Sequence, residues 1–135
     1  MNVLSILESD FLSVCISMID GNLKKQDVSF EGLATVCKYV VPVGYPDKPT
    51  KNFEVFCDQN DRSLFLASVM LKDQKLIACG SRTAAVVGKN KDVFQAELFA
   101  ETGIANISGN LFHRKDIGTK KLIDSRVKRM KELLQ

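Results

Sequence analysis

The stretch LFLASVMLKDQKLIACGSRTAAVVG, residues 64–88, decides the fold class of this chain. It contains three apolar runs, at residues 64–71, 75–79 and 83–87. Asp73 and Gln74 supply a polar turn between the first two runs, and Gly80 precedes the third. Short apolar runs separated by turn residues predict antiparallel strands. Their near-continuous apolar character favours strands that are covered on both faces, or a sheet that closes on itself.

The segment before this stretch predicts one helix and two more strands. Residues 3–20 repeat apolar side chains at three- and four-residue steps, which predicts an amphipathic helix that ends at Gly21. Residues 33–43 are rich in β-branched residues and predict a strand that leads into a Gly-Tyr-Pro turn at residues 44–46. An exposed loop and a short strand at residues 53–57 are expected to follow.

The last third of the chain predicts two helices around an extended segment. Asn90 is suited to cap the N-terminus of a helix over residues 91–102, and Gly103 is placed to end it. Residues 104–112 are expected to be extended, and Thr119 is expected to cap a final helix. The whole order predicts an α+β fold with a mainly antiparallel sheet, an N-terminal helix, an intervening helix and a C-terminal helix.

The composition is that of one ordinary domain. The 135 residues are 45% hydrophobic and 26% charged, which is enough for a single core. No apolar run approaches the roughly 18 residues that a membrane span needs, so we expect a soluble, cytoplasmic protein. The cysteines are far apart in the sequence, with no C-x-x-C pair, so we expect free thiols rather than zinc ligands or disulfides.

The net charge of +3 is concentrated near the C-terminus. Residues 112–135 hold eight Lys or Arg against three Asp or Glu. This basic segment is either a solvated helix face or a contact for an anion or nucleic acid. It has no aromatic residue after Phe112 to stack on bases, which disfavours nucleic acid as a partner. A small basic binding or oligomerisation module without catalytic activity remains the alternative function.

No self-contained catalytic signature is present. The chain lacks phosphate-binding glycine loops, zinc-protease helices and nucleophile elbows of the common types. It has one histidine, His113, and no acidic cluster at ligand spacing. We therefore assign no catalytic residue and no metal ligand, and expect His113 to be a packed or surface residue.

The tripeptide Gly80-Ser81-Arg82 is one candidate anion site. Its glycine permits a close backbone approach, its hydroxyl can donate a hydrogen bond, and its guanidinium can bind two phosphate oxygens at once. The alternative is an ordinary surface arginine at the end of a strand.

Arg114 and Lys115 form a second candidate. They precede Asp116, Gly118 and the N-terminus of the last helix, where anions are favoured. The alternative is local pairing of Asp116 with one of the two basic residues, which would only position the helix.

Three motifs together resemble one enzyme family. They are GYP at residues 44–46, GSRTAAVVG at residues 80–88 and FHRKDIG at residues 112–118. In order and spacing they resemble the C-terminal domain of the phosphoribosylamine–glycine ligases, also called glycinamide ribonucleotide synthetases. The opening MNVLSILESDFLSVC, residues 1–15, is similar to a helix that follows the magnesium-binding segment of these enzymes. The resemblance covers nearly the whole chain, although the segment after Gly88 departs from the family.

The resemblance implies an ATP-grasp ligase of purine biosynthesis. In such an enzyme ATP phosphorylates the carboxylate of glycine, and the amine of 5-phosphoribosylamine displaces the phosphate. ATP and Mg²⁺ are implied as cofactors of the complete enzyme, with none expected to be held by this chain alone. Residues 1–32 are then a helix and linker continuing from a missing ATP-grasp domain, in cis or in trans, and residues 33–135 are the C-terminal ligase domain. The chain alone is expected to be inactive.

Arg82 is the main substrate-binding candidate that the resemblance implies. Related ATP-grasp enzymes use basic residues from the corresponding strand region to hold the ribose phosphate of the substrate. Gly80 and Ser81 would shape the approach to Arg82. Arg114 and Lys115 match the family motif, and either a ligand contact or docking of the last helix is open for them.

Overall fold

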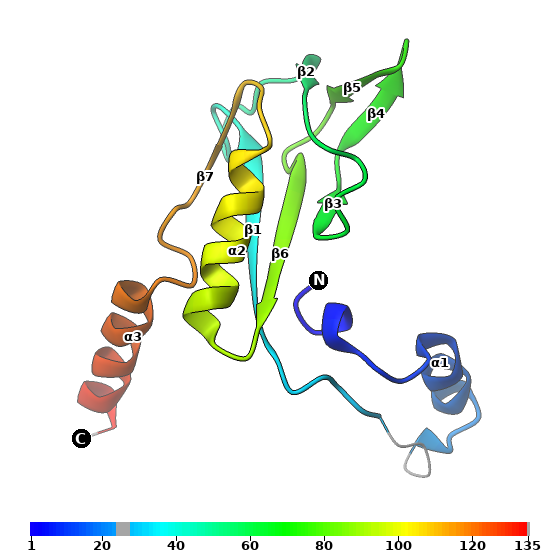
Figure 1. Ribbon diagram of the computed structural model, residues 1–135, viewed down its shortest axis with the longest axis vertical. Helices are drawn as coiled ribbons and strands as arrows, with labels where there is room; N and C mark the ends of the chain where they lie inside the picture. Colours follow the sequence, from blue (N-terminus) through cyan, green and yellow to red (C-terminus); the bar gives the residue numbers. More distant parts are fainter. Residues whose placement is uncertain (24–27, 135) are drawn as a thin grey trace.

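A computed structural model describes residues 1–23 and 28–134 (Figure 1). The elements are η1 (Leu4–Ile6), α1 (Phe11–Ile19), β1 (Ala34–Pro42), β2 (Phe53–Val55), β3 (Leu64–Leu66), β4 (Val69–Lys72), β5 (Lys75–Ala78), β6 (Ala84–Asn90), α2 (Val93–Ala105), β7 (Leu111–His113) and α3 (Lys120–Leu133). They form a four-stranded sheet in the order β3-β6-β1-β7 and a three-stranded sheet in the order β2-β5-β4. Every strand pair among the described residues is antiparallel, so the predicted α+β fold is confirmed.

Strand β1 is one of the two inner strands of the larger sheet. It pairs with β6 over seven positions, from Ala34 opposite Asn90 to Val40 opposite Ala84. On its other edge, Val40 lies opposite His113 of β7. The start of β6 and the end of β7 therefore lie level with each other on either side of Val40.

Helix α2 packs on one face of this sheet (Figure 1). Its Ala96 and Ala100 are fully buried against Val36 of β1. Gly88 of β6 lies so close that a Cβ there would collide with the backbone of Ala96 and Ala100. Small residues on both elements thus permit the close approach, and burial of Val36 beneath them contributes roughly 1.5–3 kcal/mol.

The N-terminal segment lies against the β1–β6 sheet as well. The hydroxyl of Tyr39 lies 3.8 Å from the sulfur of Met1. Lys89 Nζ donates a 2.7 Å hydrogen bond to the carbonyl of Ser5. Because Tyr39 alternates with the inward-facing Lys38 and Val40, Met1 lies on the face of β1 opposite α2.

The predicted turn at Asp73 and Gln74 is confirmed. Both residues have positive φ values, 49° and 61°, and they join β4 to β5. The predicted single strand over residues 64–71 is wrong, because the chain changes sheets at Ala67 and Ser68. Ser68 N donates to the carbonyl of Arg82, while its own carbonyl accepts from Cys79 N. One apolar run therefore contributes to two sheets. The expected coverage on both faces is confirmed for β6, whose consecutive residues Ala84 to Val87 are all buried. The other expectation, a sheet closed on itself, is wrong, because the described strands form two open sheets.

The predicted helix over residues 3–20 is also divided. After η1, Leu7 is extended and pairs with Phe30, which interrupts the helix. Asp10 then caps α1 by accepting a 2.7 Å hydrogen bond from Ser13 N. The predicted end is confirmed, since Gly21 follows α1 with a φ of 68°.

Both predicted boundaries of the second helix are wrong. Asn90 is the last residue of β6. Asp92 caps α2 by accepting 2.9 Å hydrogen bonds from the backbone amides of Phe94 and Gln95. Gly103 lies within α2, where it makes room for Val86 of the sheet beneath it. Residues 104–112 are accordingly extended only at their end, in β7, whereas Thr119 caps α3 as expected.

Candidate functional site

A hollow of about 600 Å³ opens on the face of β1 that points away from α2. We call it the arginine cleft, because both predicted arginines line it. Its lining residues are Cys37, Tyr39, Val41, Tyr45, Pro46, Arg82, Phe112, Arg114 and Ile117. The cleft therefore has apolar and aromatic walls and two cationic side chains, which is a typical composition for a small-molecule site.

The sheet order brings the two arginines together. Arg82 lies two residues before Ala84, and Arg114 follows His113 directly. Ala84 and His113 both pair with Val40, from opposite edges of β1. Side chains that are 32 positions apart in the sequence thus converge on one stretch of the central strand.

The turn after β1 supplies the aromatic rim of the cleft. Gly44 has a φ of 89°, and a Cβ at this position would collide with the carbonyl of Lys48. Only glycine adopts this conformation without strain. The Gly-Tyr-Pro motif is thereby explained, since its tight turn places Tyr45 and Pro46 at the cleft.

Arg82 is exposed and lies over an aromatic ring. Its guanidinium carbon is 5.7 Å from the centroid of the Tyr39 ring. This cation–π contact restricts the long side chain while leaving its N–H donors available. Within the described ranges, the structure shows no carboxylate paired with Arg82, so its charge is available to an anionic ligand.

Arg114 is partly engaged by a neighbour. Its Nε and Nη2 donate to the two carboxylate oxygens of Asp116 at 3.0 and 2.6 Å. Hydrogen bonds from Arg114 lower the pKa of Asp116, so this fork stays ionic at neutral pH. Two of the five guanidinium donors are used in this pair, which leaves three for a ligand. The alternative prediction, local pairing of Asp116 with a basic residue, is therefore confirmed, and Arg114 lines the cleft as well.

The remaining predicted site residues lie elsewhere. Gly80 packs against Ser68, where a Cβ would come within 2.5 Å of the Ser68 Cβ, so its small size has a packing explanation. Ser81 is exposed and is not among the lining residues of the cleft. Lys115 lines a separate hollow of about 260 Å³, together with Glu101 and His113.

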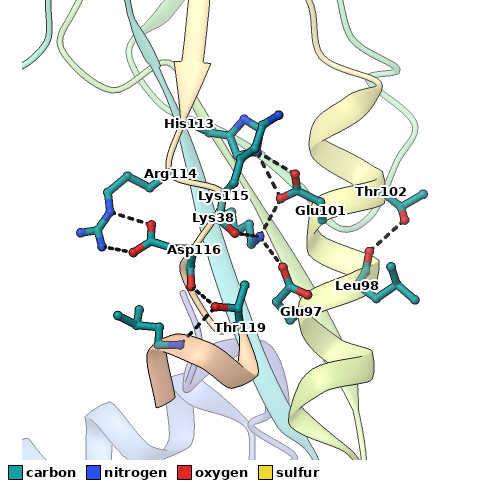
Figure 2. Close-up of polar contacts among 11 residues, drawn as sticks. Lys38, Glu97, Leu98, Glu101, Thr102, His113, Arg114, Lys115, Asp116 and Thr119 are labelled. Atoms are coloured by element: carbon teal, nitrogen blue, oxygen red, sulfur yellow. Dashed lines mark hydrogen bonds and ion pairs between the residues drawn. The ribbon is translucent and has the colours of Figure 1, made fainter. Parts of the chain in front are cut away.

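Behind the cleft, on the α2 side of β1, lies a buried charge network that the sequence did not predict (Figure 2). Lys38 is 1% exposed, and its Nζ donates to Glu97 at 2.5 Å and to Glu101 at 2.6 Å. A third bond of 3.0 Å runs from the same Nζ to the backbone carbonyl of Lys115. His113 Nε2 lies 3.0 Å from a Glu101 oxygen and joins β7 to the network.

The network keeps Glu101 ionised. Burial acts to raise the pKa of Glu101, but the hydrogen bonds and charges of Lys38 and His113 outweigh it, so the net pKa is lowered. A buried ammonium is tolerated only where carboxylates compensate its charge and its donors are satisfied. Lys38 meets both conditions through two carboxylates and one carbonyl.

The sequence carried a signal for this network. Lys38 alternates with Val36 and Val40, which places it on the buried face of its strand. Glu97 and Glu101 are four residues apart and therefore lie on one face of a helix. The signal was missed because a single lysine in a strand is usually exposed, and its partners lie about sixty positions away.

The described residues contain neither a candidate metal-binding cluster nor a candidate membrane-spanning helix. They contain no group of three or more His, Cys, Asp or Glu side chains that could hold a metal ion. None of the helices in the described part is both long and apolar enough to cross a bilayer.

Comparison with known sequences identifies the relatives of the chain. Residues 35–120 match a sequence family described as phosphoribosylglycinamide synthetase, C domain. The chain is 49% identical to a phosphoribosylamine–glycine ligase of Methanococcus vannielii, with 99% of this chain and 31% of the relative covered. It is 45% identical to a Methanosarcina acetivorans protein of the same name, with 98% and 30% covered.

A solved structure agrees with these relatives. The crystal structure of phosphoribosylamine–glycine ligase from Thermotoga maritima matches with a TM-score of 0.67 and 26% identity, over 79% of this chain and 27% of that one. The chain therefore spans roughly a third of the length of the relatives it matches. The family match, which covers more than half of the chain and includes both arginines of the cleft, shows that this chain belongs to the phosphoribosylglycinamide synthetase C-domain family.

Proposed function

We propose that this chain forms the sugar-phosphate side of the active site of a phosphoribosylamine–glycine ligase. The complete enzyme would be an ATP-grasp ligase of the cytoplasm that joins glycine to 5-phosphoribosylamine, with ATP converted to ADP and phosphate. The observation that carries the proposal is the convergence of Arg82 and Arg114 on one apolar-walled cleft. Both residues come from motifs that resemble the family.

The arginine cleft suits a phosphorylated sugar. Arg82 would bind the phosphate, since its guanidinium can donate two hydrogen bonds to one phosphate group. Arg114 would donate to the phosphate from the guanidinium N–H groups that its pair with Asp116 leaves unused. Tyr39 and Tyr45 would flank the sugar and exclude water, which strengthens the ionic contacts.

The positions of Ser81, Gly80 and Lys115 give them smaller roles in this proposal. Ser81 is exposed beside Arg82 and can reach a ligand only by a hydroxyl contact at the rim. Gly80 would keep the backbone close to Ser68 and so set the position of the tripeptide. Lys115 would act through its carbonyl, which anchors the loop, rather than through its ammonium.

The phosphorylation of glycine would be carried out by residues outside this chain. ATP and Mg²⁺ supply that chemistry in the complete enzyme, where Mg²⁺ offsets the charge of the transferring phosphoryl group. In this proposal both groups would be held by the ATP-grasp domain that the resemblance to the family implies. On its own, the chain would therefore be inactive.

Residues 1–32 would belong with that preceding domain. Phe11, Leu12 and Ile19 of α1 are 55%, 66% and 84% exposed, which is a large apolar surface for a short helix. Met1 lies beside Tyr39, so a domain joined ahead of it would arrive next to the arginine cleft. Residues 33–135 would then close the substrate side of the active site.

Reconstitution of the ligase tests this function. The chain is joined to the upstream region of the Methanococcus vannielii relative, and ATP-dependent amide formation from glycine and 5-phosphoribosylamine is measured. We expect activity in the joined protein and none in the chain alone. A folded, joined protein without ligase activity would refute the proposal.

An arginine comparison tests the site in the same joined protein. Arg82→Ala should raise the KM for 5-phosphoribosylamine about tenfold or more, the size of one or two hydrogen bonds to a charged group, with the KM for glycine unchanged. Arg62→Ala is the matched control, because Arg62 lines a different hollow. An equal effect of the two substitutions would remove Arg82 from the substrate site.

A further inference from the structure

We propose that Lys38 is a positioning residue that fixes Arg114 in the arginine cleft from the opposite side of the sheet. The inference rests on the proposed function of the cleft and adds a residue that does not touch it. Lys38 lies on the α2 side of β1, whereas its neighbour Tyr39 lines the cleft. One strand would thus hold both arginines, Arg82 on the ring of Tyr39 and Arg114 through the ammonium of Lys38.

The loop that carries Arg114 is anchored by Lys38 at its second residue, Lys115. This loop, residues 114–118, connects β7 to the cap of α3. Lys38 Nζ donates to the carbonyl of Lys115, the residue next to Arg114 (Figure 2). Since Lys115 itself is exposed, this bond reaches from the buried network to a loop at the surface. The peptide between Lys115 and Asp116, one residue beyond Arg114, is therefore held at a defined distance from the sheet.

The far end of the loop is seated on the same two elements. Gly118 has a φ of 81°, and a Cβ there would lie 2.7 Å from Val36 Cγ1 and 3.2 Å from Glu97 Cγ. Thr119 Oγ1 donates to the carbonyl of Asp116 and closes the last turn of the loop. The loop is thus fixed against β1 and α2, and Asp116 is held in place to orient the Arg114 guanidinium.

The charge of Lys38 has no evident purpose in packing. An apolar side chain of similar length would fill the same space without a compensating pair of carboxylates, and such replacements of buried ion pairs are often neutral or stabilising. What an apolar residue cannot do is donate to the Lys115 carbonyl. Glu97 and Glu101 then serve to keep the ammonium buried, and His113 holds Glu101 from β7.

The test separates this role from simple stabilisation. In the variant Lys38→Met/Glu97→Met/Glu101→Met, the lysine and both of its carboxylate partners are replaced by unbranched apolar side chains, so neither carboxylate is left without its cation. Lys75→Met is the control, because it removes a lysine that pairs with Glu54 within the other sheet, β2-β5-β4. Backbone amide exchange over residues 114–118 and the affinity for ribose 5-phosphate are measured by NMR in the intact chain.

We expect the folded triple variant to show loop amides that exchange about tenfold faster and ribose 5-phosphate bound about tenfold more weakly, the size of one hydrogen bond to a charged group. Lys75→Met should change neither value. The single substitution Lys38→Arg keeps a cation and its donors. It should leave both the loop amide exchange and the affinity for ribose 5-phosphate close to those of the unaltered chain. In the joined ligase the triple variant should raise the KM for 5-phosphoribosylamine more than it lowers kcat.

Unchanged exchange in the loop of a folded triple variant would overturn the inference. If the triple variant does not fold, Lys38→Arg is used in its place. A different hydrogen-bond length to the Lys115 carbonyl should shift the amide resonances of the loop. Unshifted resonances would overturn the inference. Failure of the unaltered chain to bind ribose 5-phosphate would count against the proposed function instead. The exchange measurement needs no ligand and remains a test of Lys38 in that case.

Discussion

Substitution of Lys38 alone should destabilise the protein far more than loss of any exposed lysine. The side chain is fully buried, and its Nζ has three acceptors within 3.0 Å. Lys38→Met would leave Glu97 and Glu101, which are 17% and 33% exposed, as neighbouring carboxylates without their cation. Breaking one side of a buried pair in this way costs about 3–5 kcal/mol.

This loss is a large share of the stability of a domain of this size. Single domains unfold with free energies of about 5–15 kcal/mol, so Lys38→Met should remove at least about a fifth of the total. The triple replacement of Lys38, Glu97 and Glu101 by Met should recover most of the loss, because the unpaired charges are gone. Lys75→Met, which breaks an exposed pair with Glu54, should change the free energy of unfolding by less than about 1 kcal/mol.

Urea unfolding followed by circular dichroism measures these differences. The free energy of unfolding is extrapolated to water for the unaltered chain and the three variants. A loss for Lys38→Met within about 1 kcal/mol of that for Lys75→Met would refute the reasoning. So would a triple variant that is no more stable than the single one, since unpaired carboxylates would then not be the cause.

Three further outcomes are expected. The pKa of Glu101 is lowered, so its contribution to stability should be complete above about pH 4.5 and should be lost as the pH falls through its folded pKa. Acid unfolding of the unaltered chain and of Glu101→Gln will check this. Gly88→Ala should cost at least about 1–3 kcal/mol because the added carbon meets the backbone of α2, whereas Gly32→Ala, which meets nothing within 4 Å, should be tolerated; thermal unfolding compares them. Burial raises the pKa of Cys37, so its thiol should react with iodoacetamide more slowly than glutathione at pH 8, as followed by mass spectrometry.

Local patterns predicted most of the elements, and tertiary contacts decided where they end. The turn at Asp73 and Gln74 and the cap at Thr119 depend on neighbouring residues only, and both were predicted. Gly103 was expected to end a helix, but it lies inside α2 because the helix must pass close to Val86. That requirement comes from the packing of helix on sheet, which a single segment does not reveal.

For the candidate site as well, local motifs predicted single residues, and the fold determined which of them lie together. Arg82 and Arg114 were chosen separately from their motifs, and only the strand order β6-β1-β7 shows that they line one cleft. Lys38 was overlooked because its meaning depends on Glu97 and Glu101, which reach it only once α2 covers β1. Residue type and spacing could thus nominate single side chains, whereas their partners followed from the topology.

The most direct test of the central claim is the affinity of the intact chain for ribose 5-phosphate. Calorimetric titration is carried out on the unaltered protein and on Arg82→Met, Arg114→Met and the control Arg62→Met. The shared cleft predicts that each of the first two substitutions weakens binding about tenfold to a hundredfold, as expected for lost hydrogen bonds to a charged group, while the control binds like the unaltered chain. Binding that Arg82→Met and Arg114→Met leave unchanged, or that Arg62→Met weakens equally, would contradict the account.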